Sequence, residues 1–407
     1  MLVDTRPLRV TEFRRLWAAG IVTALGAQLT AVAVPLQIYA LTGSSAYVGL
    51  AGLIGFAPMA LAALWAGALA DVHDRRRVLL ATTTCIGATS ALLWAQAWAD
   101  LRSTGVLLLL TGVQQALFGA NTAVSRAVTP RLLPLEALPA ANALQSTVIL
   151  SAGITGPLLA GALIPAVGPQ TLYLTDATAV CATLWAVWRL PALPPTVNTT
   201  HTHPPPSAIQ RITEGLLLLT RHQLLLVVCL SDFAALFLAL PTALFPQLAG
   251  EAFHPSDIGV LYAALSAGGL LAALFSRLFT RVGRHGLAIG VSIAVWGAAV
   301  AGFGFSRSLL TASVWLVLAG GALLTLSVFR QTVLQTAAPD DMRGRLQGID
   351  TVLAAGGPRL GDLAHGTAGA TLGTTWTITG GGLLTVAVAV AVLLLCRVDR
   401  PPPRCAA

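Results

Sequence analysis

The chain has 407 residues, of which 56% are hydrophobic and only 10% charged, with a mean hydropathy of +0.78. Soluble domains carry about 25% charged residues, so this composition excludes a soluble protein domain. All 24 basic residues are arginine, against 16 acids, for a formal charge of +8. A Walker A loop needs a lysine, so ATP binding by that route is excluded. The arginines are scattered through apolar sequence, which favours a lipid bilayer over nucleic acid as the partner.

Apolar segments of membrane-spanning length recur along the whole chain. A hydrocarbon core about 30 Å thick needs about 20 apolar residues per helix. Residues 16–70 contain no charged side chain, and Thr42-Gly-Ser-Ser45 has the composition of a turn between two spans. The same pattern predicts twelve membrane helices, at 16–41, 46–70, 78–98, 104–127, 140–166, 171–189, 223–248, 258–280, 286–306, 308–335, 347–372 and 374–396.

The arginines predict the orientation of these helices. With the N-terminus inside, all but three of the 24 arginines lie in inner segments, Arg330 among them. Arg102 and Arg307 fall in outer loops, and Arg359 falls within a helix. Cytoplasmic loops carry an excess of basic residues, so both termini are expected in the cytoplasm. The protein itself is expected in the cytoplasmic (inner) membrane.

The predicted helices fall into two halves joined by a linker. Residues 191–222 are rich in Pro and Thr, which is typical of an extended linker between bundles at 1–190 and 223–407. Gly156-Pro157 in the fifth span recurs as Gly357-Pro358 in the eleventh, and the interval between the two pairs is about half the chain length. This spacing predicts two parallel six-helix repeats with a substrate site between them. Two linker histidines without a nearby Cys or acid do not make a metal site.

The loop between the second and third spans carries a specific motif. Its sequence, from Gly67 and Asp71 to Arg75, Arg76 and Arg77, resembles the cytoplasmic signature of the major facilitator superfamily, with Asp74 in place of a glycine. The resemblance implies an all-α membrane protein with twelve helices in two six-helix bundles. Gly67 would allow close helix approach, and Asp71 would bridge to an arginine or a helix N-terminus and latch one state.

A second motif lies in the fifth span, where Gly156, Pro157 and Gly161 resemble the antiporter motif of drug exporters in that superfamily. A proline kinks a membrane helix, and the flanking small residues admit a neighbouring helix. A simple packing kink is an equal alternative. A second exporter motif, an arginine early in the fourth span, is missing, and Gly112 stands in its place.

Further segments narrow the resemblance. Phe13 to Trp17, Val34 to Gln37 and Thr336 to Gln347 are similar to the branch that holds the enterobactin exporter and macrolide efflux proteins. That branch implies proton-driven export of a siderophore of the enterobactin type, or alternatively of macrolides and other drugs, by a monomer without cofactor or metal. An importer on the same fold and an integral membrane enzyme are the remaining alternatives. No catalytic motif supports the enzyme.

Charges within spans are costly and are therefore candidates for proton coupling. Asp232 is expected about 13 Å from the inner surface, given about 1.5 Å per residue. Arg359 and Asp362 share a helix face. They are either a coupling pair, which Asp232 meets in one state of the transporter, or a structural pair whose charges neutralise each other. Asp176 is expected near the outer end of the sixth span, where an interfacial role is equally plausible. Asp232→Asn is expected to abolish gradient-driven export and leave folding largely intact.

Other polar side chains within the spans can serve a substrate cavity or bridge helices. Uncharged candidates for hydrogen bonds to cargo are Gln28, Gln37, Gln115 and Asn121, together with Gln114. His365, one helical turn from Asp362, is expected to be a neutral, packed histidine rather than a titrating group.

Overall fold

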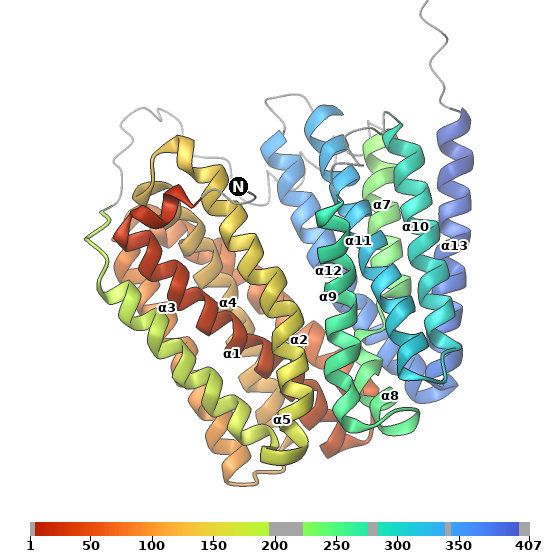
Figure 1. Ribbon diagram of the computed structural model, residues 1–407, viewed down its shortest axis with the longest axis horizontal. Helices are drawn as coiled ribbons and strands as arrows, with labels where there is room; N and C mark the ends of the chain where they lie inside the picture. Colours follow the sequence, from red (N-terminus) through yellow and green to blue (C-terminus); the bar gives the residue numbers. More distant parts are fainter. Residues whose placement is uncertain (1–4, 195–222, 276–283, 338–342, 399–407) are drawn as a thin grey trace, which may run out of the picture. The chain divides into compact units, whose positions relative to one another are not determined.

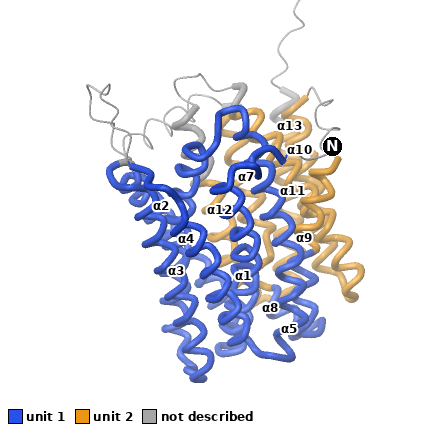
Figure 2. The backbone as a smooth tube through the Cα atoms, turned by 60° about the vertical axis from the view of Figure 1, so that its left-hand side comes forward, with its two compact units in different colours: residues 1–202, 245–263 blue, residues 203–244, 264–407 orange. Residues whose placement is uncertain are grey.

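The computed structural model describes residues 5–194, 223–275, 284–337 and 343–398, which form helices and the connections between them (Figure 1). The predicted linker lies largely outside the described residues. By its internal contacts the chain forms two compact units, residues 1–202 with 245–263 and residues 203–244 with 264–407 (Figure 2). The division into two bundles at 1–190 and 223–407 stays a prediction.

The first unit is built on five long helices. They are α1 (Thr11–Thr42), α2 (Ser45–Val72), α3 (Arg75–Trp98), α4 (Thr104–Leu132) and α5 (Leu138–Trp188), with short helices η1 (Arg6–Arg9), η2 (Leu135–Ala137), α8 (Phe245–Glu251) and η4 (Pro255–Asp257). Helix α5 packs on α1 and α3, while α4 packs on α2 and α3. The polar side chains of α1, α3 and α4 are thereby brought to the face of α5.

The second unit holds the remaining long helices. They are α7 (Gln223–Ala239), α10 (His285–Gly304), α11 (Leu309–Ala337), α12 (Arg343–Leu372) and α13 (Thr374–Val398), with η3 (Thr242–Leu244). Helix α9 (Ile258–Leu274) begins in the first unit and ends in the second. Helices α12 and α13 both pack on α7, and α10 packs on α11 and α13.

The expected membrane helices are present. Ten helical segments of the described chain are long and apolar enough to cross a bilayer. One of them contains α5, whose 51 residues turn at Gly168 (φ 72°), so that α5 comprises two of the predicted spans. Helix α12 has 30 residues, enough to span, but it is not among these apolar segments. The count of twelve membrane helices stays a prediction.

The seventh predicted span, 223–248, is not one continuous helix. Helix α7 ends at Ala239, and the chain continues as η3 and α8. Pro241 explains the break, because it donates no backbone hydrogen bond and pushes the residue before it out of helical geometry. The break matters for the site, since it brings Thr242 to Asp362 in α12.

Candidate functional site

The α2–α3 connection is held by its arginines. The Arg75 side chain donates from Nε to the Ala70 carbonyl at 3.2 Å and from Nη1 to the Ala127 carbonyl at 3.3 Å, while Arg76 donates from Nη2 to the Trp188 carbonyl. These carbonyls lie near the C-terminal ends of α2, α4 and α5. Basic groups are favourable there because helix C-termini carry partial negative charge. The two arginines therefore tie three helix ends together.

Asp74 builds the turn for which the family signature uses glycine. Its Oδ1 accepts hydrogen bonds from the backbone N–H of Arg76 at 2.9 Å and of Leu193 at 3.1 Å. The first bond caps the N-terminus of α3. The Arg75 N–H in turn donates to the Leu193 carbonyl at 3.1 Å. Leu190 and Leu193 are themselves buried, so the segment after α5 is fixed against the α2–α3 connection.

The remaining residues of this motif differ in what they contribute. A Cβ at Gly67 would meet no heavy atom within 4 Å, so the close helix approach expected at this glycine is not found in this structure. Arg77 is exposed. Asp71 lies in the last turn of α2, and its side chain is outside the described part of the structure, so its role as a latch stays a prediction.

The glycines of the α5 motif face two different neighbours. A Cβ at Gly156 would collide with the side chain of Gln28 on α1. A Cβ at Gly161 would lie 2.5 Å from the Ser256 carbonyl oxygen and 2.9 Å from Cα of Gly259. Both glycines are therefore required by packing, the first against α1 and the second against η4 and the start of α9.

Asp176 is the centre of a polar cluster from four helices. Its Oδ2 accepts hydrogen bonds from Thr30 Oγ1 on α1 at 3.0 Å, from Ser90 Oγ on α3 at 2.9 Å and from Gln114 Nε2 on α4 at 3.4 Å. The residue is only 2% exposed. It lies about two helical turns beyond Gly168. These three partners are all uncharged, so this carboxyl group can exchange a proton without breaking an ion pair to them.

The uncharged cavity candidates divide into two pairs. Gln37 and Gln96 exchange amide hydrogen bonds at 3.1 and 3.2 Å, and Asn121 donates to the hydroxyl groups of Thr82 and Thr83. These two candidates bridge helices. Gln28 and Gln115 are half-buried, and their amides make no described hydrogen bond, so their role toward cargo stays a prediction.

Asp232 forms a buried ion pair with Arg330. Arg330 Nη1 on α11 donates to Asp232 Oδ2 on α7. Both residues are buried, with 1% exposure for Asp232 and 6% for Arg330. Arg330 lies within α11, inside the predicted span 308–335, and in this structure it is the partner of Asp232. The contact of Asp232 with Arg359 in another state stays a prediction. The pair joins α7 to α11.

Asp362 anchors a second charged cluster on α12. Its Oδ1 accepts from Thr242 Oγ1 at 2.7 Å, and its Oδ2 lies 3.7 Å from Arg359 Nη1. Asp362 is buried, while the Arg359 side chain is about one-third exposed. A Cβ at Gly361 would lie 2.7 Å from the Phe237 carbonyl oxygen, so α12 and α7 are in close backbone contact beside this carboxylate.

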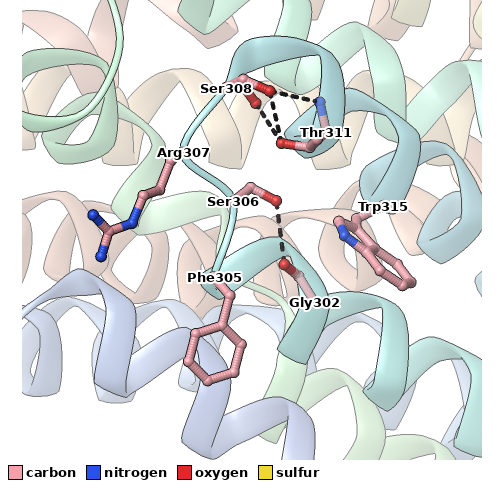
Figure 3. A pocket seen from close by; sticks show the side chains of 7 residues that line it. All are labelled: Gly302, Phe305, Ser306, Arg307, Ser308, Thr311 and Trp315. Atoms are coloured by element: carbon pink, nitrogen blue, oxygen red, sulfur yellow. Dashed lines mark hydrogen bonds between the residues drawn. The ribbon is translucent and has the colours of Figure 1, made fainter.

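A cavity of about 530 Å³ lies at the α10–α11 connection, lined by Phe305, Arg307, Trp315 and the hydroxyl-bearing residues between them (Figure 3). None of the candidate site residues proposed from the sequence lines this cavity, and its lining contains no acidic side chain. This cavity is therefore separate from the proton-coupling candidates. Among the described residues, no group of three or more His, Cys, Asp or Glu could hold a metal ion.

Sequence reasoning missed four partners in these clusters: Thr30, Ser90, Thr242 and Arg330. The hydroxyl groups carry no signal of their own in an apolar sequence. Arg330 could have been found, because it falls inside the predicted span 308–335, where a charged side chain is costly.

The chain resembles known proteins along nearly its full length. A family described as "Transmembrane secretion effector" matches residues 4–402. The chain is 31% identical to the enterobactin exporter of Citrobacter koseri, over 99% of this chain and 96% of that protein. It is 29% identical to the enterobactin exporter of Shigella boydii serotype 18, over the same shares of both.

Solved structures with a similar fold are also transporters. The nucleoside transporter NupG has a TM-score of 0.72 at 13% identity, with 96% of this chain and 100% of that chain covered. A bacterial homologue of the iron transporter ferroportin, in an inward-facing state, has a TM-score of 0.67 at 16% identity, with 94% and 98% covered. At these identities the likeness shows the fold alone.

Proposed function

Because the chain belongs to the transmembrane secretion effector family of the major facilitator superfamily, we propose that it exports a siderophore of the enterobactin type, driven by protons. The observation that carries this proposal is the likeness to enterobactin exporters over nearly the full length of both chains. The transporter is a multi-pass protein of the inner membrane, and the arginine bias supports termini in the cytoplasm.

Proton coupling is supported by three buried acids: Asp176, Asp232 and Asp362. Carboxyl groups held within membrane helices form proton relays in transporters. Moving one charge through 100 mV supplies about 2.3 kcal/mol, which sustains roughly a fiftyfold cargo gradient. The chain has no lysine for a Walker A loop, which removes the commonest route to ATP as the energy source.

The motif residues are assigned to conformational change and cargo binding. Asp71 would latch the α2–α3 connection, where Arg75 and Arg76 bind the ends of three helices. The Gly156–Gly161 segment would be a packing element whose separation from η4 and α9 accompanies reorientation. Gln28 and Gln115 would supply hydrogen bonds to the cargo, since their amides make no described bond.

The test is a comparison of a deletion strain with its parent under iron limitation. The proposal expects loss of secreted catechol siderophore and its accumulation in the cell, with restoration by the wild-type gene. A drug-susceptibility panel is measured beside it. Unchanged siderophore secretion with altered macrolide tolerance would replace the siderophore by a drug as the cargo.

A further inference from the structure

Both ring nitrogens of His365 face carbonyl oxygens. Nδ1 lies 2.8 Å from the carbonyl oxygen of Gly361 in the same helix, and Nε2 lies 2.9 Å from that of Leu238 on α7. A neutral imidazole has one N–H donor, whereas an imidazolium has two. A neutral ring would therefore direct a nitrogen lone pair at a carbonyl lone pair. Only the doubly protonated ring satisfies both contacts as hydrogen bonds.

The charges around the ring also favour a cation. Leu238 precedes the last residue of α7, so its carbonyl belongs to the final turn, where carbonyls lack helical partners and the helix end is partly negative. Asp362 lies three residues before His365 on α12 and interacts with it electrostatically. A protonated His365 would thus have both an anionic neighbour and a negative helix end.

Backbone packing shields this contact from water. His365 is 5% exposed. On α13, a Cβ at Gly381 would lie 3.1 Å from His365 Nε2 and would collide with the Leu238 carbonyl oxygen. The glycine lets the α13 backbone cover the bond between His365 and Leu238. A water molecule therefore has little room to take over either side of this bond.

We propose that His365 carries a proton as an imidazolium and in that form clasps α12 to the C-terminal end of α7. When the proton leaves to water, the ring is left neutral with one N–H. The bond to Gly361 within α12 can keep that N–H, so the bond to Leu238 between the helices is lost. The clasp would then open, and α7 could move relative to α12. The use of this clasp in transport rests on the proton-driven export proposed above. The charge state of His365 does not depend on that proposal.

The other ionisable groups near the clasp are few. On α12 they are Asp362 and Arg359, and on α7 the nearest is Asp232, in its pair with Arg330. The described residues of η3, and those of α13 beside His365, include no ionisable side chain. Asp232 and Leu238 are about 9 Å apart along α7, at about 1.5 Å per residue. Helix α7 therefore connects the His365 clasp to the Asp232–Arg330 pair.

The direct test is nitrogen NMR of the full-length protein in lipid nanodiscs with labelled histidine, without cargo. Replacing each of the other histidines in turn assigns the His365 signals without altering His365. The proposal expects both ring nitrogens of His365 to be protonated at about pH 7, near which an exposed histidine is largely neutral. His254, which is exposed, is the internal control. A His365 ring with one unprotonated nitrogen under these conditions overturns the clasp.

A second measurement tests its use in transport. His365→Gln keeps two N–H donors on one nitrogen but does not titrate, and His254→Gln is the matched control. With enterobactin as the probe in proteoliposomes, His365→Gln should fold and lose the pH dependence of export, while the control keeps it. Retention of the parental pH profile by His365→Gln would overturn the role in coupling. If wild type does not move enterobactin, the proposed cargo fails, and the NMR result still decides the clasp.

Discussion

Asp232 on α7 pairs with Arg330 on α11, although Arg359 is the arginine that the sequence offers most visibly within a span. This pairing changes what a substitution at Asp232 should do. A buried carboxylate that holds a buried guanidinium cannot be neutralised without consequence for its partner. Coupling and folding are therefore linked at this pair.

We expect Asp232→Asn to lower stability, contrary to the expectation from sequence that folding would be largely unaffected. Removing one member of a buried ion pair costs about 3–5 kcal/mol, because the other charge keeps its desolvation penalty. Arg330→Gln should cost a similar amount, and the double variant Asp232→Asn/Arg330→Gln should recover most of the loss. Thermal unfolding of the purified variants in detergent measures this. Losses that simply add in the double variant would show that the two side chains do not interact.

Asp176→Asn should behave differently, because the groups that donate hydrogen bonds to Asp176 are the hydroxyls of Thr30 and Ser90 and the amide of Gln114. The amide keeps an oxygen that accepts from Thr30 and Ser90, so folding should be retained while gradient-driven export is lost. Asp176→Leu leaves those donors without an acceptor and should cost about 1–3 kcal/mol. Asp100→Asn, at an exposed acid paired with Arg102, is the control. Parental export by Asp176→Asn would exclude Asp176 from coupling.

Gly161→Ala should destabilise the protein, since its Cβ would press on the backbone of Ser256 and Gly259. Overpacking of this kind costs about 1–3 kcal/mol. Gly380→Ala is the matched control on α13, where a Cβ meets nothing within 4 Å. There the alanine should be neutral or stabilise the helix by up to about 1 kcal/mol. Equal unfolding temperatures for the two variants would contradict the packing role of Gly161.

Asp74→Gly restores the glycine of the superfamily signature and should nevertheless destabilise this chain. It removes the cap on α3 and the acceptor for the Leu193 N–H. Replacement of an N-cap residue by glycine costs only about a few tenths of a kcal/mol, so most of the expected loss comes from the Leu193 N–H, which loses its acceptor. Asp74→Asn keeps the accepting oxygen and should stay close to wild type. The unfolding temperatures of the two variants and of wild type measure this difference. A higher unfolding temperature for Asp74→Gly than for wild type would contradict the capping role of Asp74.

Much of the fold could be predicted because hydropathy and proline positions are local properties of the sequence. The membrane helices were expected close to where they lie, and Gly168 divides α5 near the predicted gap. The break after Ala239 was missed, since hydropathy continues through Pro241 to Glu251. Only the proline itself marks it.

The site could be predicted only in part, because pairing depends on which helix faces meet. Asp176, Asp232 and Asp362 were recognised from their cost in an apolar environment, which sequence reports directly. Their partners come from other helices, and the sequence contains no information on rotation about the helix axes. Gln37 and Asn121 illustrate the same limit, since their amides bridge helices rather than remaining available to cargo.

The measurement that tests the account most directly is enterobactin movement in proteoliposomes containing the purified protein, with an imposed proton gradient and a pH-sensitive dye. The account predicts that enterobactin moves against its own gradient while protons move in the opposite direction, and that an uncoupler abolishes both. It also predicts that Asp176→Asn abolishes the coupled proton movement. Enterobactin movement that is unchanged by the uncoupler would contradict proton-driven export.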